Sequence, residues 1–64
     1  MHTTILRNRD GKELGRITPL GKELVLHNRQ GVELGRYNMI QDTTRDTAGR
    51  LVGRGNLLTY LLAT

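Results

Sequence analysis

The sequence predicts an all-β fold, an antiparallel meander of about six short strands followed by a short C-terminal α-helix. Three observations predict it: a short phrase recurs along the chain, turn residues recur about every ten residues, and the leucine spacing changes after Gly55. The phrase occupies residues 8–16, recurs at 28–36 and recurs more loosely at 46–54. Such a repeat is a unit that buries its apolar face only by packing on its copies.

Each copy of the phrase opens with turn chemistry. Asn or Asp at the first position and Gly at the fourth are typical of a type I turn followed by a left-handed glycine. Hairpin turns are therefore predicted at 8–11, 28–31 and 46–49. Pro19 at the second position predicts a further turn at 18–21, and 38–41 is the remaining turn. The strands are expected near residues 3–8, 12–18, 22–28, 32–38, 42–46 and 50–54.

After Gly55 the pattern is that of an amphipathic helix over residues 56–63. Asn56 is a good N-cap, and leucines recur at spacings of three and four. Because two helical turns are not stable alone in water, this helix is expected to dock on something. One hypothesis is contact with another subunit or partner; the other is that the helix plugs an open end of its own sheet. The residues assigned to the partner contact are Leu57, Leu58, Leu61, Leu62 and Tyr37.

Size and composition indicate one small domain, residues 1–64, that needs support from outside its own core. The chain has no cysteine, which excludes disulfides and thiolate metal sites, and it has no Phe or Trp. A core of leucine, isoleucine and valine is small for a 64-residue chain, so we expect a homo-oligomer. No apolar stretch has the length of a signal peptide or membrane span, so we expect a cytoplasmic protein with no membrane contact.

Each copy ends in a Gly-Arg pair, and the strand glycines indicate a bulge, a bend or a close backbone approach. Strict alternation puts Arg16 on the face of Leu14, so three arginines are expected to ring one end of the core unless a bulge reverses them. They then either lie over the apolar edge and pair with glutamates, or bind an anion. The candidate anion-binding residues are Arg16, Arg36 and Arg54, extended by Arg9 and Arg29 at the turn tips.

Candidate catalytic chemistry is sparse. His2 and His27 are the candidates for general bases in the sequence, and neither has a nucleophile or metal-ligand spacing beside it. We therefore expect no enzyme activity, no cofactor and no metal. The net charge of +4 is modest, and eight of the ten cations are arginine. The preferred hypothesis is a self-associating interaction module that binds a protein partner; the alternative is an anion-binding module for nucleotide or nucleic-acid phosphate.

The turn glycine, the Gly-Arg pair that follows it and the closing residues 53–58 together resemble small bacterial domains described as the four-fold beta flower. The resemblance covers residues 6–62 and implies repeated two-stranded petals with pseudo-symmetry. It implies no activity. The third copy departs from the pattern, because Leu51 stands where Glu13 and Glu33 stand in the first two.

Overall fold

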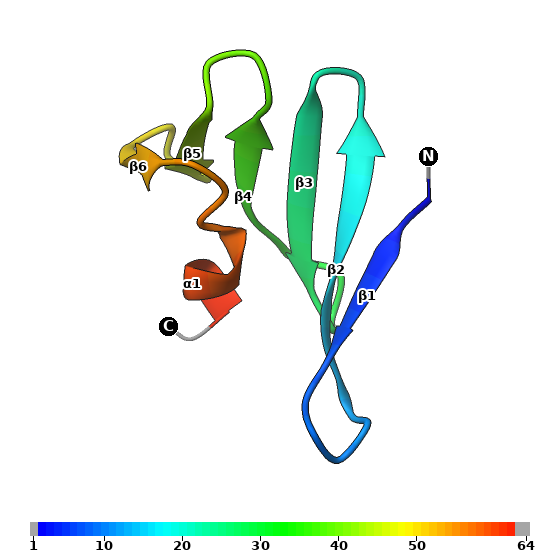
Figure 1. Ribbon diagram of the computed structural model, residues 1–64. Helices are drawn as coiled ribbons and strands as arrows, with labels where there is room; N and C mark the ends of the chain where they lie inside the picture. Colours follow the sequence, from blue (N-terminus) through cyan, green and yellow to red (C-terminus); the bar gives the residue numbers. More distant parts are fainter. Residues whose placement is uncertain (1, 63–64) are drawn as a thin grey trace.

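Six antiparallel strands lie in chain order across a single sheet, as the meander prediction requires (Figure 1). The computed structural model describes residues 2–62. Its strands are β1 (Thr4–Arg7), β2 (Glu13–Leu20), β3 (Glu23–Asn28), β4 (Glu33–Asn38), β5 (Thr43–Asp46) and β6 (Leu51–Arg54), followed by the helix α1 (Leu58–Leu62). The helix begins later than the predicted residue 56, and residue 63 lies outside the described residues. Asn56 Oδ1 accepts a hydrogen bond from the Leu58 amide at 3.2 Å, as an N-cap does.

The three predicted hairpin turns are confirmed. In each turn the amide of the glycine at the fourth position donates to the carbonyl of the first residue, at 2.9 to 3.0 Å. In the second copy Asn28 Oδ1 also accepts from the amides of Gln30 and Val32, and Gly31 has a φ of 86°. The side chain of the first residue thus holds the turn, and the left-handed glycine turns the chain into the next strand.

The turn predicted at 18–21 is wrong by about two residues. Pro19 lies inside β2, Leu20 pairs with Glu23, and Gly21 and Lys22 make the turn. β1 pairs with β2 only as far as Ile17, so the end of β2 is a free sheet edge. A proline is tolerated in a strand at such an edge, where one side of the ladder has no partner.

Each hairpin contains a β-bulge just before its strand glycine. In the first hairpin Leu6 pairs with Gly15 and Arg7 with Glu13, which leaves Leu14 as the extra residue. Leu34 and Val52 are the extra residues of the other two hairpins. A bulge interrupts the alternation of side chains along a strand, so Glu13 and Arg16 lie on one face of the sheet.

The strand glycines make room for the helix on the opposite face. A methyl group placed on Gly35 would collide with Leu61 of α1 and would lie 2.7 Å from the Arg45 carbonyl. The equivalent methyl on Gly15 would collide with the His27 carbonyl of β3 and would also approach Leu62, and on Gly53 it would approach Leu57. The helix lies closest to β4, in the middle of this row of glycines (Figure 1). The helix therefore packs on one face of its own sheet.

The buried core is small. Among the described residues, Val25, Leu26 and Leu58 are the buried apolar residues. Thr44 is also fully buried, and its hydroxyl donates to the Gly55 carbonyl at 2.7 Å and accepts from the Leu57 amide at 3.0 Å. These two hydrogen bonds attach the segment before the helix to β5.

Candidate functional site

The face of the sheet opposite the helix, called the open face below, carries the repeated arginines. In the strand register Arg16 of β2 lies opposite His27 of β3, and Arg36 of β4 lies opposite Arg45 of β5. Arg54 pairs with Thr43, which lines a groove on this face. Leu14 instead lines a hollow beside Leu62 on the helix side. Strict alternation, which would put Arg16 on the face of Leu14, does not hold; the stated exception applies, because the bulge at Leu14 reverses the arginine.

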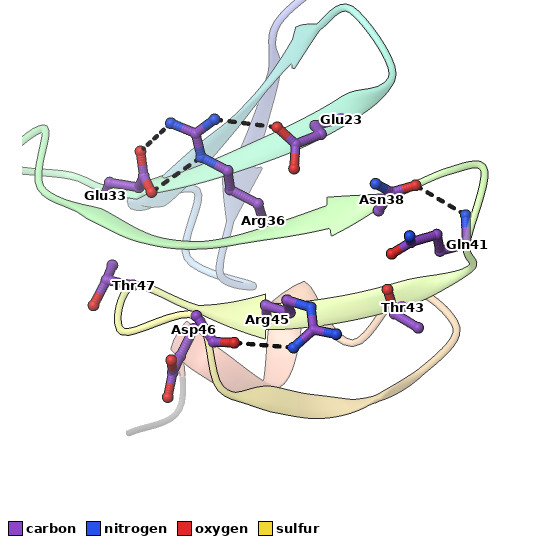
Figure 2. A pocket seen from close by; sticks show the side chains of 10 residues that line it. Glu23, Glu33, Arg36, Asn38, Gln41, Thr43, Arg45, Asp46 and Thr47 are labelled. Carbon is purple, nitrogen blue, oxygen red and sulfur yellow. Dashed lines mark hydrogen bonds and ion pairs between the residues drawn. The ribbon is translucent and has the colours of Figure 1, made fainter.

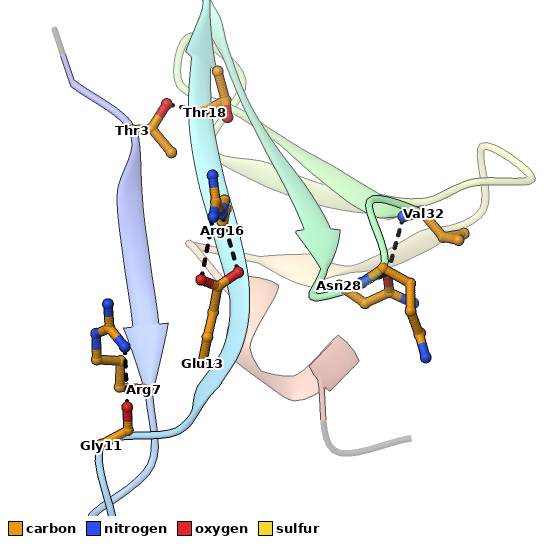
Figure 3. A network of polar contacts seen from close by, with 9 residues as sticks. Thr3, Arg7, Gly11, Glu13, Arg16, Thr18, Asn28 and Val32 are labelled. Carbon is orange, nitrogen blue, oxygen red and sulfur yellow. Dashed lines mark hydrogen bonds and ion pairs between the residues drawn. The ribbon is translucent and has the colours of Figure 1, made fainter.

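Two of the three arginines are neutralised within the chain. The Arg16 guanidinium donates two hydrogen bonds to Glu13, at 3.0 and 3.2 Å (Figure 3). Arg36 makes the same paired contact with Glu33, at 3.0 and 3.2 Å, and a further one with Glu23 at 3.2 Å (Figure 2). The hydrogen bonds from Arg16 and Arg36 lower the pKa values of Glu13 and Glu33, respectively. Two of the three copies thus have the arrangement in which arginine pairs with glutamate.

The third copy lacks this pair. Leu51 occupies the position of Glu13 and Glu33, and Asp46 binds Arg50 instead, at 3.0 Å. The backbone amide of Arg50, with a smaller contribution from its guanidinium, lowers the pKa of Asp46. Within residues 2–62, Arg54 has no carboxylate within ion-pair distance. Arg54 is therefore the repeated arginine whose charge no carboxylate of this part of the chain offsets.

The register spreads the three arginines along a diagonal. Gly15 lies opposite Asn28 of β3, whereas Gly35 lies opposite Leu26 of the same strand, two residues away. Each copy is shifted in this way relative to the one before it. The strand and residue spacings put successive arginine Cα atoms about 12 Å apart. The expected ring of arginines is therefore a row instead, and one small anion cannot contact all three.

A polar groove of about 360 Å³ lies on the open face between β4 and β5 (Figure 2). Arg45 lines it and donates to the Gly49 carbonyl at 3.0 Å. Thr43 also lines it, and among the described residues its buried hydroxyl oxygen has no hydrogen-bond partner. Sequence reasoning did not find Arg45 or Thr43, because only the strand register brings them beside Arg54.

The two arginines at the turn tips lie in different surroundings. Arg29 lines a second hollow of about 290 Å³ together with Arg16 and His27. Arg9 is exposed in the first hairpin turn and lines none of the hollows described here. The structure thus brings Arg29 near Arg16 and leaves Arg9 apart.

The residues assigned to partner contact are used largely within the chain. Leu58 is fully buried, and Leu57, Leu61 and Leu62 lie over the strand glycines. The Tyr37 hydroxyl donates to Asp42 at 2.6 Å, which raises the pKa of Tyr37. The alternative hypothesis, in which the helix packs on its own sheet, describes these contacts.

Between residues 2 and 62, no His, Cys, Asp and Glu side chains are grouped so that they could hold a metal ion. In the same part of the chain, no helix has both the length and the apolar character needed to cross a bilayer. No protein-family model, curated protein or solved structure matches the chain.

Proposed function

We propose that this chain is a non-enzymatic, cytoplasmic interaction module that self-associates and binds a protein partner. The observation that carries the proposal is the imbalance between its core and its surface. Three apolar residues are buried within the described chain, whereas nine large hydrophobic residues are 38 to 72% exposed. Burial of apolar surface is the main favourable contribution to folding, and a second subunit supplies what the small core lacks.

The exposed area supports the same proposal. The chain exposes 4616 Å², whereas a folded monomer of 7.2 kDa typically exposes roughly 4,100 Å². A domain that exposes more surface than is typical of its mass is stabilised when a second subunit covers part of that surface. We also propose, from the repeated phrase, that the chain is related to the four-fold beta flower domains.

Sedimentation velocity across micromolar concentrations tests self-association. We expect a species heavier than the 7.2 kDa monomer whose share grows with concentration. Far-UV circular dichroism on the same samples checks that the β-sheet is intact. A folded monomer at every concentration would overturn the proposal.

The second candidate function is anion binding at the β5–β6 end of the open face. Among residues 2–62 Arg54 has no carboxylate partner, and the Cα atom of Thr43 lies opposite it. Arg45 is two residues further along β5, so Arg45 and Arg54 are diagonal neighbours, whose Cα atoms lie about 7–8 Å apart. At this Cα spacing the two arginine side chains are long enough to contact one phosphate together.

A titration with inorganic phosphate and a short single-stranded oligonucleotide at low salt tests this candidate. Binding is expected in the wild type and lost in Arg54→Gln. Arg50→Gln is the matched control, because Arg50 is already paired with Asp46. Since phosphate contacts release counterions, affinity should fall as salt rises. Absence of binding at low salt, or equal binding in both variants, rules out the anion site.

A further inference from the structure

The two outer edges of the sheet differ in how well they are protected against pairing. Edge strands are usually guarded by charges, bulges or covering segments. β6 contains the bulge at Val52, then Gly53 and Arg54, and the chain leaves the sheet at Gly55, whose φ is 81°. The β6 edge therefore offers a neighbour almost no regular ladder.

β1 has none of these devices along most of its length. Residues 3–6 are Thr-Thr-Ile-Leu, without charge, proline or glycine. The charged residue of β1, Arg7, donates to the Gly11 carbonyl at 3.0 Å (Figure 3). The first strand lies at the outer edge of the sheet and has a partner only in β2 (Figure 1). Its outer backbone groups are available to another strand.

An apolar hollow of about 330 Å³ lies directly beside this edge on the helix side. Leu6 of β1, Leu14 of β2 and Leu62 of α1 line it, with Arg7 and Thr59. Leu14 is 42% exposed although it points toward the helix side. The unprotected edge and the uncovered apolar surface thus lie at the same place.

We propose that β1 of one copy pairs antiparallel with β1 of a second copy, so that two sheets become one and the two hollows join. This inference rests on the self-association proposed above. A two-fold axis that makes two strands antiparallel is perpendicular to the sheet, so both helices lie on the same face. Residues paired across antiparallel strands share a face, so a residue of the helix side meets another of that side. We place Leu6 opposite the partner's Leu6, which joins the leucines of the two hollows.

The β1 strand of a second copy fits this edge better than β6 of a second copy does. The pairing places Arg7 opposite the partner's Ile5, so like charges are not directly opposed. β6 of another copy cannot take this place, because its chain turns away after Arg54. A stable interface buries roughly 800 Å² on each partner, more than four edge residues supply, so the leucines of the hollow are needed. The dimer should therefore be weak and depend on concentration.

Sedimentation of the full chain with Ile5→Lys tests the edge. Ile5 is 40% exposed on β1, and a lysine there places two charges close to the two-fold axis. The dimer dissociation constant should rise roughly tenfold or more, a loss of about 1.4 kcal/mol. Val32→Lys is the matched control: Val32 is 57% exposed in the second hairpin turn, and its substitution should leave the dissociation constant unchanged.

A cysteine variant tests the register even if Ile5→Lys does not fold. The chain has no cysteine, so Leu6→Cys introduces a single thiol. Directly opposite residues of antiparallel strands have Cα atoms about 4.5–5.5 Å apart, within disulfide range. Oxidised Leu6→Cys should form a covalent dimer, whereas Ile5→Cys should form far less, because its two thiols lie diagonally across the axis.

These outcomes distinguish the proposed β1–β1 contact from self-association in general. A folded wild-type monomer overturns both. A dimer that tolerates Ile5→Lys and leaves Leu6→Cys unlinked overturns the edge alone. A dimer that tolerates Ile5→Lys but is lost in Tyr60→Ser overturns the edge too, and places the contact on the helix, where Tyr60 is 68% exposed.

Discussion

Replacing Gly35 with alanine should destabilise the fold, because the added methyl group meets both the helix and the backbone of the neighbouring strand. The added methyl group would collide with Leu61 and would lie 2.7 Å from the Arg45 carbonyl oxygen. The leucine end can move, but the backbone oxygen belongs to the ladder between β4 and β5 and cannot move without breaking it. Gly53→Ala is the matched control, because its methyl would meet only the end of Leu57.

The expected loss follows from two opposing contributions. Overpacking a well-packed site costs about 1–3 kcal/mol. Alanine recovers about 0.5–1 kcal/mol relative to glycine inside a strand, because glycine loses more backbone freedom on folding. Gly35→Ala should therefore lose about 1–2 kcal/mol of unfolding free energy, or roughly 4–16 °C in Tm for a domain of this size. Gly53→Ala should remain within about 1 kcal/mol of the wild type.

Thermal and urea unfolding followed by circular dichroism, at one fixed protein concentration, measures both losses. Combining Gly35→Ala with Leu61→Ala isolates the helix contribution, since the shortened side chain no longer meets the new methyl group. The double variant should lose less than the sum of the two single losses. If Gly35→Ala is as stable as the wild type, or if the two losses add, the glycines do not serve to admit the helix.

Three further outcomes follow from single contacts. Leu58→Ala should lose about 2–5 kcal/mol of unfolding free energy. This is a large part of the roughly 3–10 kcal/mol typical of a 64-residue domain. Leu51→Ala is the control: it changes a 55% exposed position and should shift the urea midpoint little. Thr44→Val leaves the Gly55 carbonyl and the Leu57 amide unpaired, so stability should fall by roughly 1–3 kcal/mol and hydrogen exchange at Leu57 should quicken. Arg36 holds the pKa of Glu33 below its ordinary 4.5, so the ion pair stabilises the fold above pH 4.5 and stops doing so as pH falls through the lowered pKa. Glu33→Gln should therefore be less stable than the wild type at pH 7 and should lose less stability on acidification to pH 3; parallel urea curves for the two proteins would contradict this.

The local features of the fold could be predicted because the residues that make them are close in sequence. Asn28 and Gly31 form a turn through contacts within five residues, and the same chemistry recurs in the other two copies. Asn56 and the leucine spacing predict the helix in the same way. The sequence also shows that Leu51 replaces the glutamate in the third copy, which is the reason that Arg54 lacks an ion pair among the described residues.

By itself, the sequence determined the hairpins, their order and the helix, because turns, caps and leucine spacing act over a few residues. Only the tertiary structure decided which face each side chain takes. The bulges at Leu14, Leu34 and Val52 exist only when two strands pair, and each of them changes the alternation on which the arginine prediction depended. The same pairing places Arg45 and Thr43 beside Arg54. It also aligns the strand glycines under α1. The register between distant strands has no local signal in the chain, so these placements could not be predicted from the sequence.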